Sequence, residues 1–198
     1  MLVVPSVYFG NIFYWKSLFS APEACVDEGE FFVKQTYRNR AEIATEKGVT
    51  PLTVPLEKGK NNKQPMHEVR ISYNENWRAL HFKTICSAYG KAAYFDHYRP
   101  GLERMYAGQP AFLCDWNRLW LRFFSEEFGL PALPGHTSRY VETQPADTDL
   151  RPLMHPKADV DLVQKPYYHV FFDKFPLPQN LAVIDLLMNE GPHGRFFL

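Results

Sequence analysis

The stretch from about Pro110 to Phe128 constrains the fold more than any other part of the sequence. Its large apolar side chains recur at helical spacing and form one broad face, made of Phe112, Leu113, Trp116, Leu119, Trp120, Phe123 and Phe124. Arg118, Arg122 and Ser125 lie on the opposite side. Aromatic side chains of this size have to be covered by other elements when the chain folds. We therefore expect this helix to pack at the centre of the molecule.

The composition indicates a folded chain with a real core. Of the 198 residues, 45% are apolar and 16% are aromatic, which is too apolar for a disordered segment. We predict one domain over residues 1–198. The 22 acidic and 22 basic residues leave no net charge, so no overall field favours nucleic acid or an anionic membrane. Any recognition of charge is expected to be local.

The start of the chain is apolar, but it lacks a basic segment and a small-residue cleavage site, so we do not expect a signal peptide. No other run approaches the roughly 20 apolar residues of a membrane-spanning helix. The cysteines Cys25, Cys86 and Cys114 are widely spaced and form no CxxC pair. We expect a cytoplasmic protein with reduced thiols, without a metal site and without a cofactor.

The first half of the chain has mostly strand-like patterns. Strands are predicted over residues 2–4, 24–27, 31–43, 52–56 and 69–73. A helix is predicted from about Gly10 to Ser20, because Ile12, Trp15 and Phe19 recur at helical spacing. Residues 57–65 are polar and rich in turn formers, which predicts a mobile loop.

Helical spacing dominates from Asn76, with one helix ending at Gly90 and a second piece from Pro100 to Gly108, before the aromatic helix. Residues 129–166 are rich in proline and lack a period, which predicts a long surface loop and suggests a lid. A buried strand at 167–172 and a helix at 180–189 close the chain. The predicted class is mixed α/β, with strands concentrated in the N-terminal half, a helical middle, a long Pro-rich loop, and a final strand and helix.

The most informative polar stretch is KQTYRNR at residues 34–40. If this stretch is extended, one face carries Lys34, Arg38 and Arg40, and the other face carries Gln35, Tyr37 and Asn39. Guanidinium groups bind carboxylate or phosphate in bidentate geometry, so the cationic face suits a phosphorylated or carboxylated small molecule. The alternative is a solvated strand face, which composition alone favours.

His81 lies four residues after Trp77, so it points toward the apolar face of its predicted helix. A buried, oriented imidazole is suited to general base catalysis, and the alternative is a core histidine bonded to a carbonyl. Asn117 lies among apolar positions of the aromatic helix, where its amide either fastens core elements or binds a ligand. Asp115 lies at the margin of that face, where pairing with Arg118 is the structural explanation.

Two other chemistries receive less support. A cysteine nucleophile needs an electropositive, partly open setting, whereas Cys86 and Cys114 have the surroundings of small buried hydrophobes. The loop that leads into the helix at Gly10-Asn11 has the generic geometry for binding an anion with free backbone amides. Because that loop contains no histidine, a histidine-dependent nucleotidyltransferase is a distant option.

Several stretches resemble the WbqC-like family in order and spacing. They are VYFGNIFYW, FVKQTYRNRAEI, LTVPLEKG, WRALHFKTICSAYGKAAYFDHY, FLCDWN, MHPK and LAVIDLLMNEGP, from about Tyr8 to Pro192. The positions that match its motifs are Asn11, Lys34, Gln35, Asn39, Arg40, His81, Tyr89, Asp115 and Asn117. The cysteines match no motif position. The resemblance implies a context of bacterial surface polysaccharide biosynthesis, including O-antigen, and does not supply a reaction.

Two main hypotheses follow. The first is a transferase that places an acyl or aminoacyl group on a nucleotide-linked amino sugar, with His81 as the catalytic base. Its substrate-binding candidates are Asn11, Lys34, Gln35, Arg38, Asn39, Arg40, Asp115 and Asn117. The second is a non-catalytic binding or scaffolding protein of the same pathway, and a cysteine-dependent hydrolase is a weaker third. Convergence of Lys34, Arg40, His81 and Asn117 on one cleft would favour the enzyme.

Overall fold

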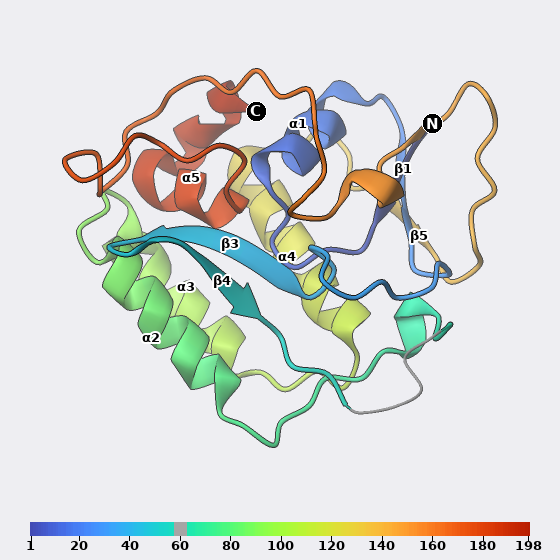
Figure 1. The fold of residues 1–198 in the computed structure, drawn as a ribbon, viewed down its shortest axis with the longest axis horizontal. Coiled ribbons are helices and arrows are strands. Elements are labelled where there is room, and N and C mark those ends of the chain that lie inside the picture. Colours follow the sequence, from blue (N-terminus) through green and yellow to red (C-terminus); the bar gives the residue numbers. More distant parts are fainter. Residues whose placement is uncertain (58–62) are drawn as a thin grey trace.

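The structure is a computed structural model that describes residues 1–57 and 63–198. The loop predicted at 57–65 falls mainly on residues 58–62, which lie outside the described part. The helices are α1 (Ile12–Ser20), α2 (Trp77–Tyr89), α3 (Phe95–Ala107), α4 (Leu113–Phe128) and α5 (Val183–Glu190) (Figure 1). The strands are β1 (Leu2–Pro5), β2 (Ala24–Asp27), β3 (Arg40–Thr45), β4 (Gly48–Thr53), β5 (Gly135–Thr137) and β6 (Thr148–Asp149). The mixed α/β class is confirmed.

The main sheet is parallel, with the strand order β5-β2-β1-β6. Val3 and Val4 of β1 are fully buried, as expected for a parallel strand covered on both faces. Both outer strands come from residues 129–166, so the predicted Pro-rich loop is present but also contributes two short strands to the sheet. Because β5 and β6 are only three and two residues long, no period marks them in the sequence.

The second sheet is the antiparallel hairpin of β3 and β4, which runs from Arg40 opposite Thr53 to Thr45 opposite Gly48. β3 contacts both α2 and α5, so the hairpin lies between these helices (Figure 1). The strand predicted at residues 52–56 corresponds to β4, which begins at Gly48 and ends at Thr53.

Two predicted strands are wrong or much shorter than expected. Phe31 makes only an isolated bridge to Pro65, and residues 34–39 form turns instead of continuing an extended run, with a φ of 60° at Gln35. The physical reason is that Arg38 turns inward to pair with buried Glu30. The stretch 69–73 contributes only isolated bridges, through Arg70 and Ile71.

Helix α2 ends as predicted, because Asn76 caps its first turn and Gly90 follows its last residue. Helix α3 begins at Phe95, so the prediction that Pro100 starts the helix is wrong. Pro100 lies inside α3 on an exposed position, where losing one backbone hydrogen bond leaves no buried group unpaired.

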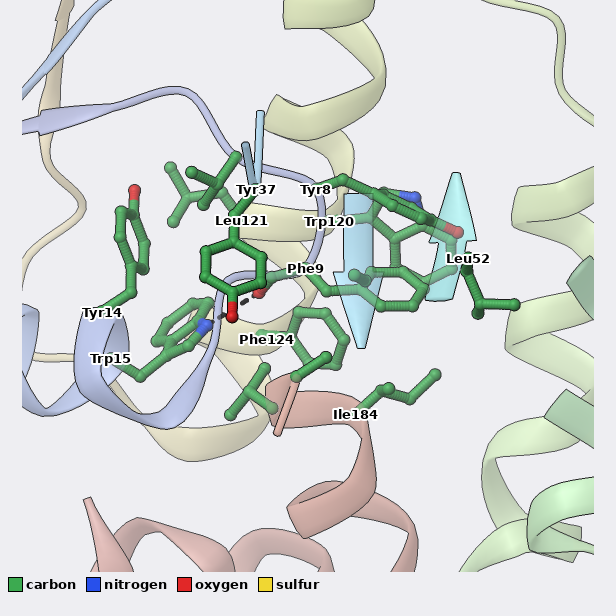
Figure 2. Packing of buried hydrophobic residues seen from close by; sticks show 14 of the residues in the cluster. Tyr8, Phe9, Tyr14, Trp15, Tyr37, Leu52, Trp120, Leu121, Phe124 and Ile184 are labelled. Carbon is green, nitrogen blue, oxygen red and sulfur yellow. Dashed lines mark hydrogen bonds between the residues drawn. The ribbon is translucent and has the colours of Figure 1, made fainter. Parts of the chain in front are cut away.

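Helix α4 packs at the centre, as its aromatic face predicted. Trp116, Trp120 and Phe124 are fully buried, and Leu119 is exposed, so the buried arc is narrower than expected. Figure 2 shows Trp120 and Phe124 against Phe9 from the loop after β1, with Trp15 of α1 beside them. The Trp15 indole donates a hydrogen bond to the Phe9 carbonyl at 2.8 Å. This aromatic contact joins the parallel sheet to the helical half.

The strand predicted at residues 167–172 is not formed, and α5 follows where the last helix was expected. Tyr168 and Phe172 are exposed, whereas the Tyr167 hydroxyl bonds to buried Asp185 of α5. The segment is therefore held by side chains and not by a sheet ladder. Among the described residues, none of the helices combines the length and the hydropathy that spanning a bilayer requires.

Candidate functional site

The N-terminus of α1 is not a free anion site. Its first amides donate to the carbonyl of Leu181, to Asn180 Oδ1 and to Asn11 Oδ1, at 3.0, 2.9 and 2.9 Å. The expectation of free amides at Gly10-Asn11 is therefore wrong, because a distant segment of the chain satisfies them. Asn11 itself is the helix cap.

Because residues 34–39 form turns, Lys34, Arg38 and Arg40 do not share the predicted cationic face. Lys34 and Gln35 are exposed. Arg38 is buried and makes two hydrogen bonds to Glu30, at 2.8 and 2.6 Å. Arg40 pairs with Glu42 of the same strand at 2.7 Å. These cations consequently do not line one surface.

The amide side chains of the predicted site fasten backbone segments. Asn39 Nδ2 donates to the Val54 carbonyl at 2.9 Å. Asn117 Nδ2 donates to Ser6 Oγ and to the Arg38 carbonyl, at 3.2 and 2.9 Å, and thereby ties α4 to the loop after β1. Among the described residues, Asn117 Oδ1 has no hydrogen-bond partner.

Asp115 lies half-exposed on α4 and pairs with Arg118 at 3.2 Å, the structural explanation expected from the sequence. Arg118 also bonds to Glu28, which follows β2. Burial would raise the pKa of Glu28, but hydrogen bonds and charges from His136 and Arg118 outweigh burial and lower it. The carboxylate is thus held ionised by its neighbours.

A second set of ion pairs lies at the carboxyl end of the parallel sheet, and no sequence pattern predicted these pairs. Arg151 pairs with Asp27 at the end of β2 and with Asp149 of β6. This edge is a common ligand position in α/β sheets, but here the two carboxylates Asp27 and Asp149 hold Arg151, so this guanidinium is not free to bind an anion. In the part of the chain that the structure describes, no cluster of three or more His, Cys, Asp or Glu is placed to hold a metal ion.

His81 lies on α2 and is 4% exposed. Its Nδ1 is 3.2 Å from the hydroxyl of Tyr8, which in turn lies 2.5 Å from the hydroxyl of Tyr106 on α3. Burial lowers the pKa of His81 to about 4, although a hydrogen bond to the Thr53 backbone opposes this shift. The imidazole is therefore neutral near pH 7 and fixed in orientation.

His81 lines a cavity of about 420 Å³ between β4 and α2. Trp77 and Pro51 give this cavity an apolar wall, and Thr53 and Glu75 add polar groups. Of the predicted site residues within the described chain, His81 is the one that lines it.

A wider cavity of about 830 Å³ continues along α2 toward the β3–β4 turn and residues 170–174. The two cavities share Thr50, Leu80 and Thr84, so we treat them together as the α2 groove. Lysines from several elements line the wider end, a feature that single-sequence patterns did not reveal. In the sequence, each of these lysines lies near the end of an element or on the polar face of a helix, and nothing groups them.

These features define a mixed α/β protein with a short parallel sheet, an antiparallel hairpin and a groove between that hairpin and a histidine-bearing helix. The model of the WbqC-like protein family matches residues 6–161. The chain therefore belongs to the WbqC-like family. No curated protein and no solved structure matches it. The family match ends at residue 161, so the resemblance expected up to Pro192 is confirmed only to that point, and residues 170–174 of the groove lie beyond it.

Proposed function

We propose that the chain is a transferase that places an acyl or aminoacyl group on the amine of a nucleotide-linked amino sugar held in the α2 groove. The observation that carries this proposal is the position of a neutral, oriented His81 in the wall of a groove that combines apolar and hydroxyl groups. Pro51 and the largely buried Trp77 form the apolar wall of the groove, and Thr53 and Thr84 suit the hydroxyls of a sugar. The family context of surface polysaccharide and O-antigen biosynthesis supports the same substrate class.

In the proposed reaction, the sugar amine attacks the carbonyl carbon of an activated ester or thioester donor. A C–N bond forms, and the bond from the carbonyl carbon to the leaving alcohol or thiol breaks. The proton lost by the amine passes to His81 and then to the leaving group. The low pKa keeps His81 neutral, and taking up that proton requires the imidazole to exchange its contact with Tyr8 or with the Thr53 backbone for one with the amine.

The cysteines support a reaction without a thiolate. Burial raises the pKa of the thiols of Cys25, Cys86 and Cys114, so each stays protonated near pH 7. A variant with all three cysteines changed to serine or alanine is expected to keep its turnover. Loss of turnover in a folded variant of this kind would instead favour the cysteine-dependent alternative.

A specific observation favours the second candidate, a non-catalytic binding or scaffolding protein. Both sides of the His81 ring already have protein partners, Tyr8 and the Thr53 backbone. Asn11, Arg38, Asn39 and Asn117 likewise bond to the protein itself, as structural residues do.

The deciding experiment compares native protein with His81→Asn and with His97→Asn, a matched change at an exposed histidine of α3. A panel of nucleotide-linked amino sugars is incubated with acyl and aminoacyl donors, and products are followed by mass spectrometry. The proposal expects His81→Asn to bind sugar but to lose about 100-fold or more in turnover. Full turnover by folded His81→Asn would refute the role of His81. No turnover by the native protein, together with large destabilisation of His81→Asn, would favour the scaffold.

A further inference from the structure

The wider end of the α2 groove carries an excess of positive charge. Four lysines line it against two carboxylates, and the whole set consists of Lys47, Lys83, Lys91, Lys174, Glu46 and Asp173. They come from the β3–β4 turn, from α2 and the residue after its cap, and from residues 170–174. Their convergence is a product of tertiary packing, in a chain whose net charge is zero.

One of these lysines already forms an ion pair. Lys174 pairs with Glu46, and this contact ties residues 170–174 to the β3–β4 turn. In the part of the chain that the structure describes, no ion pair involves Lys47, Lys83 or Lys91. Glu46 is shared among the lysines, because its pKa is lowered by Lys174 first and also by Lys47 and Lys91, and Asp173 lines the same cavity. Four lysines against two carboxylates still leave an excess of positive charge, which an entering anion offsets.

The other walls of this cavity indicate what kind of anion fits. Ser87 adds a hydroxyl group and Phe171 adds an aromatic ring, whereas the Thr45 hydroxyl already donates to the Gly48 carbonyl at 3.0 Å. Lysine ammonium groups bind phosphate as point charges, and an aromatic ring stacks on a nucleobase. A volume of about 830 Å³ lies within the range of sites that hold whole small molecules.

We propose that the wider end of the α2 groove binds a nucleoside diphosphate, with Lys47, Lys83 and Lys91 on the phosphates and Phe171 against the base. The ligand then points along the shared wall of Thr50, Leu80 and Thr84 toward His81. This direction rests on the proposed function, whereas the anion site itself does not. Phosphate recognition thus falls to lysines outside the predicted face of residues 34–40.

The test is isothermal titration of the full chain with uridine diphosphate and, separately, with inorganic pyrophosphate. The variant Lys83→Glu/Lys91→Glu reverses two exposed charges on the groove. Its matched control, Arg122→Glu/Lys157→Glu, makes the same change in net charge at exposed positions that do not line the groove. We expect the groove variant to weaken binding of both ligands at least about ten-fold and the control to leave it within about two-fold.

Phe171→Ala separates the two parts of the site, because it should weaken uridine diphosphate and leave pyrophosphate unchanged. The proposal is overturned if the native protein binds neither ligand, or if the control weakens binding as much as the groove variant does. His81→Asn is expected to bind uridine diphosphate normally. Normal nucleotide binding with no transfer in any assay would support the nucleotide site and reject the transferase. Transfer that is unaffected by Lys83→Glu/Lys91→Glu would support the transferase and reject the nucleotide site.

Discussion

The buried carboxyl group of Asp185 makes the stability of this protein depend on pH in a defined direction. Asp185 lies on α5 at 1% exposure and accepts hydrogen bonds from the hydroxyls of Tyr89 and Tyr167, at 2.9 and 2.8 Å. Burial raises its pKa from 3.8 to about 6, although the two tyrosines and Asn189 lower it in part. The folded protein therefore holds this proton more tightly than the unfolded chain does.

The sign follows from that difference. The stability that the proton contributes is fully present below pH 3.8 and is lost as the pH rises through about 6. The size of the pKa shift corresponds to about 3 kcal/mol of unfolding free energy over this window. Asp185→Asn resembles the protonated acid, because its oxygen accepts from one tyrosine hydroxyl and its NH2 group donates to the other, and it does not titrate. Relative to native protein, the variant is expected to gain about 2.5 kcal/mol between pH 4 and pH 7.

Urea unfolding at half-unit steps of pH, with both proteins in the same buffers, measures this difference directly. Asp161→Asn, at an exposed position, is the matched control and should follow the native curve. The reasoning is refuted if the difference between Asp185→Asn and native protein stays constant from pH 4 to pH 7, or if it grows toward acid.

Three further predictions concern other buried groups. His81→Gln should remove an opposite dependence, since the lowered pKa costs native protein about 3 kcal/mol as the pH falls from 7 to 4, measurable by the same unfolding series. Gly10→Ala should destabilise by about 2 to 4 kcal/mol, because φ is +72° and a Cβ would lie 2.8 Å from two buried ring atoms. Its control Gly48→Ala, at φ +93° with open space, should cost only about 1 kcal/mol in thermal unfolding. Arg38→Met should cost about 3 to 5 kcal/mol and adding Glu30→Leu should recover part of it, so an additive double-mutant cycle would contradict the buried pair.

The elements that the sequence predicts well are those whose signals are local. Asn76, Gly90 and the spacing between them define α2, and the aromatic face of α4 forces its burial. The elements that it misses depend on distant partners. The turns at residues 34–39 follow from the pairing of Arg38 with Glu30, and β5 and β6 form because β2 and β1 offer them an edge.

The same division applies to the candidate site. The inward direction of His81 follows from its spacing from Trp77 and is confirmed by its burial. The lysines of the α2 groove could not be grouped in advance, because Lys47 and Lys174 meet only when the hairpin turn and the segment before α5 lie side by side. Asn117 and Asp115 were expected either to bind a ligand or to support structure, and a single sequence does not distinguish these roles. Their part in substrate binding stays a prediction.

The strand order β5-β2-β1-β6 has a consequence for how the chain reaches its fold. β1 and β2 leave the ribosome first, yet the strands that close their two edges begin at Gly135 and Thr148. Both edges of the β1–β2 pair therefore stay unpaired while the helices are synthesised. Pairing of β6 with β1 requires contacts between residues 2 and 148. Such late, long-range pairing slows folding and exposes the open edges to other chains.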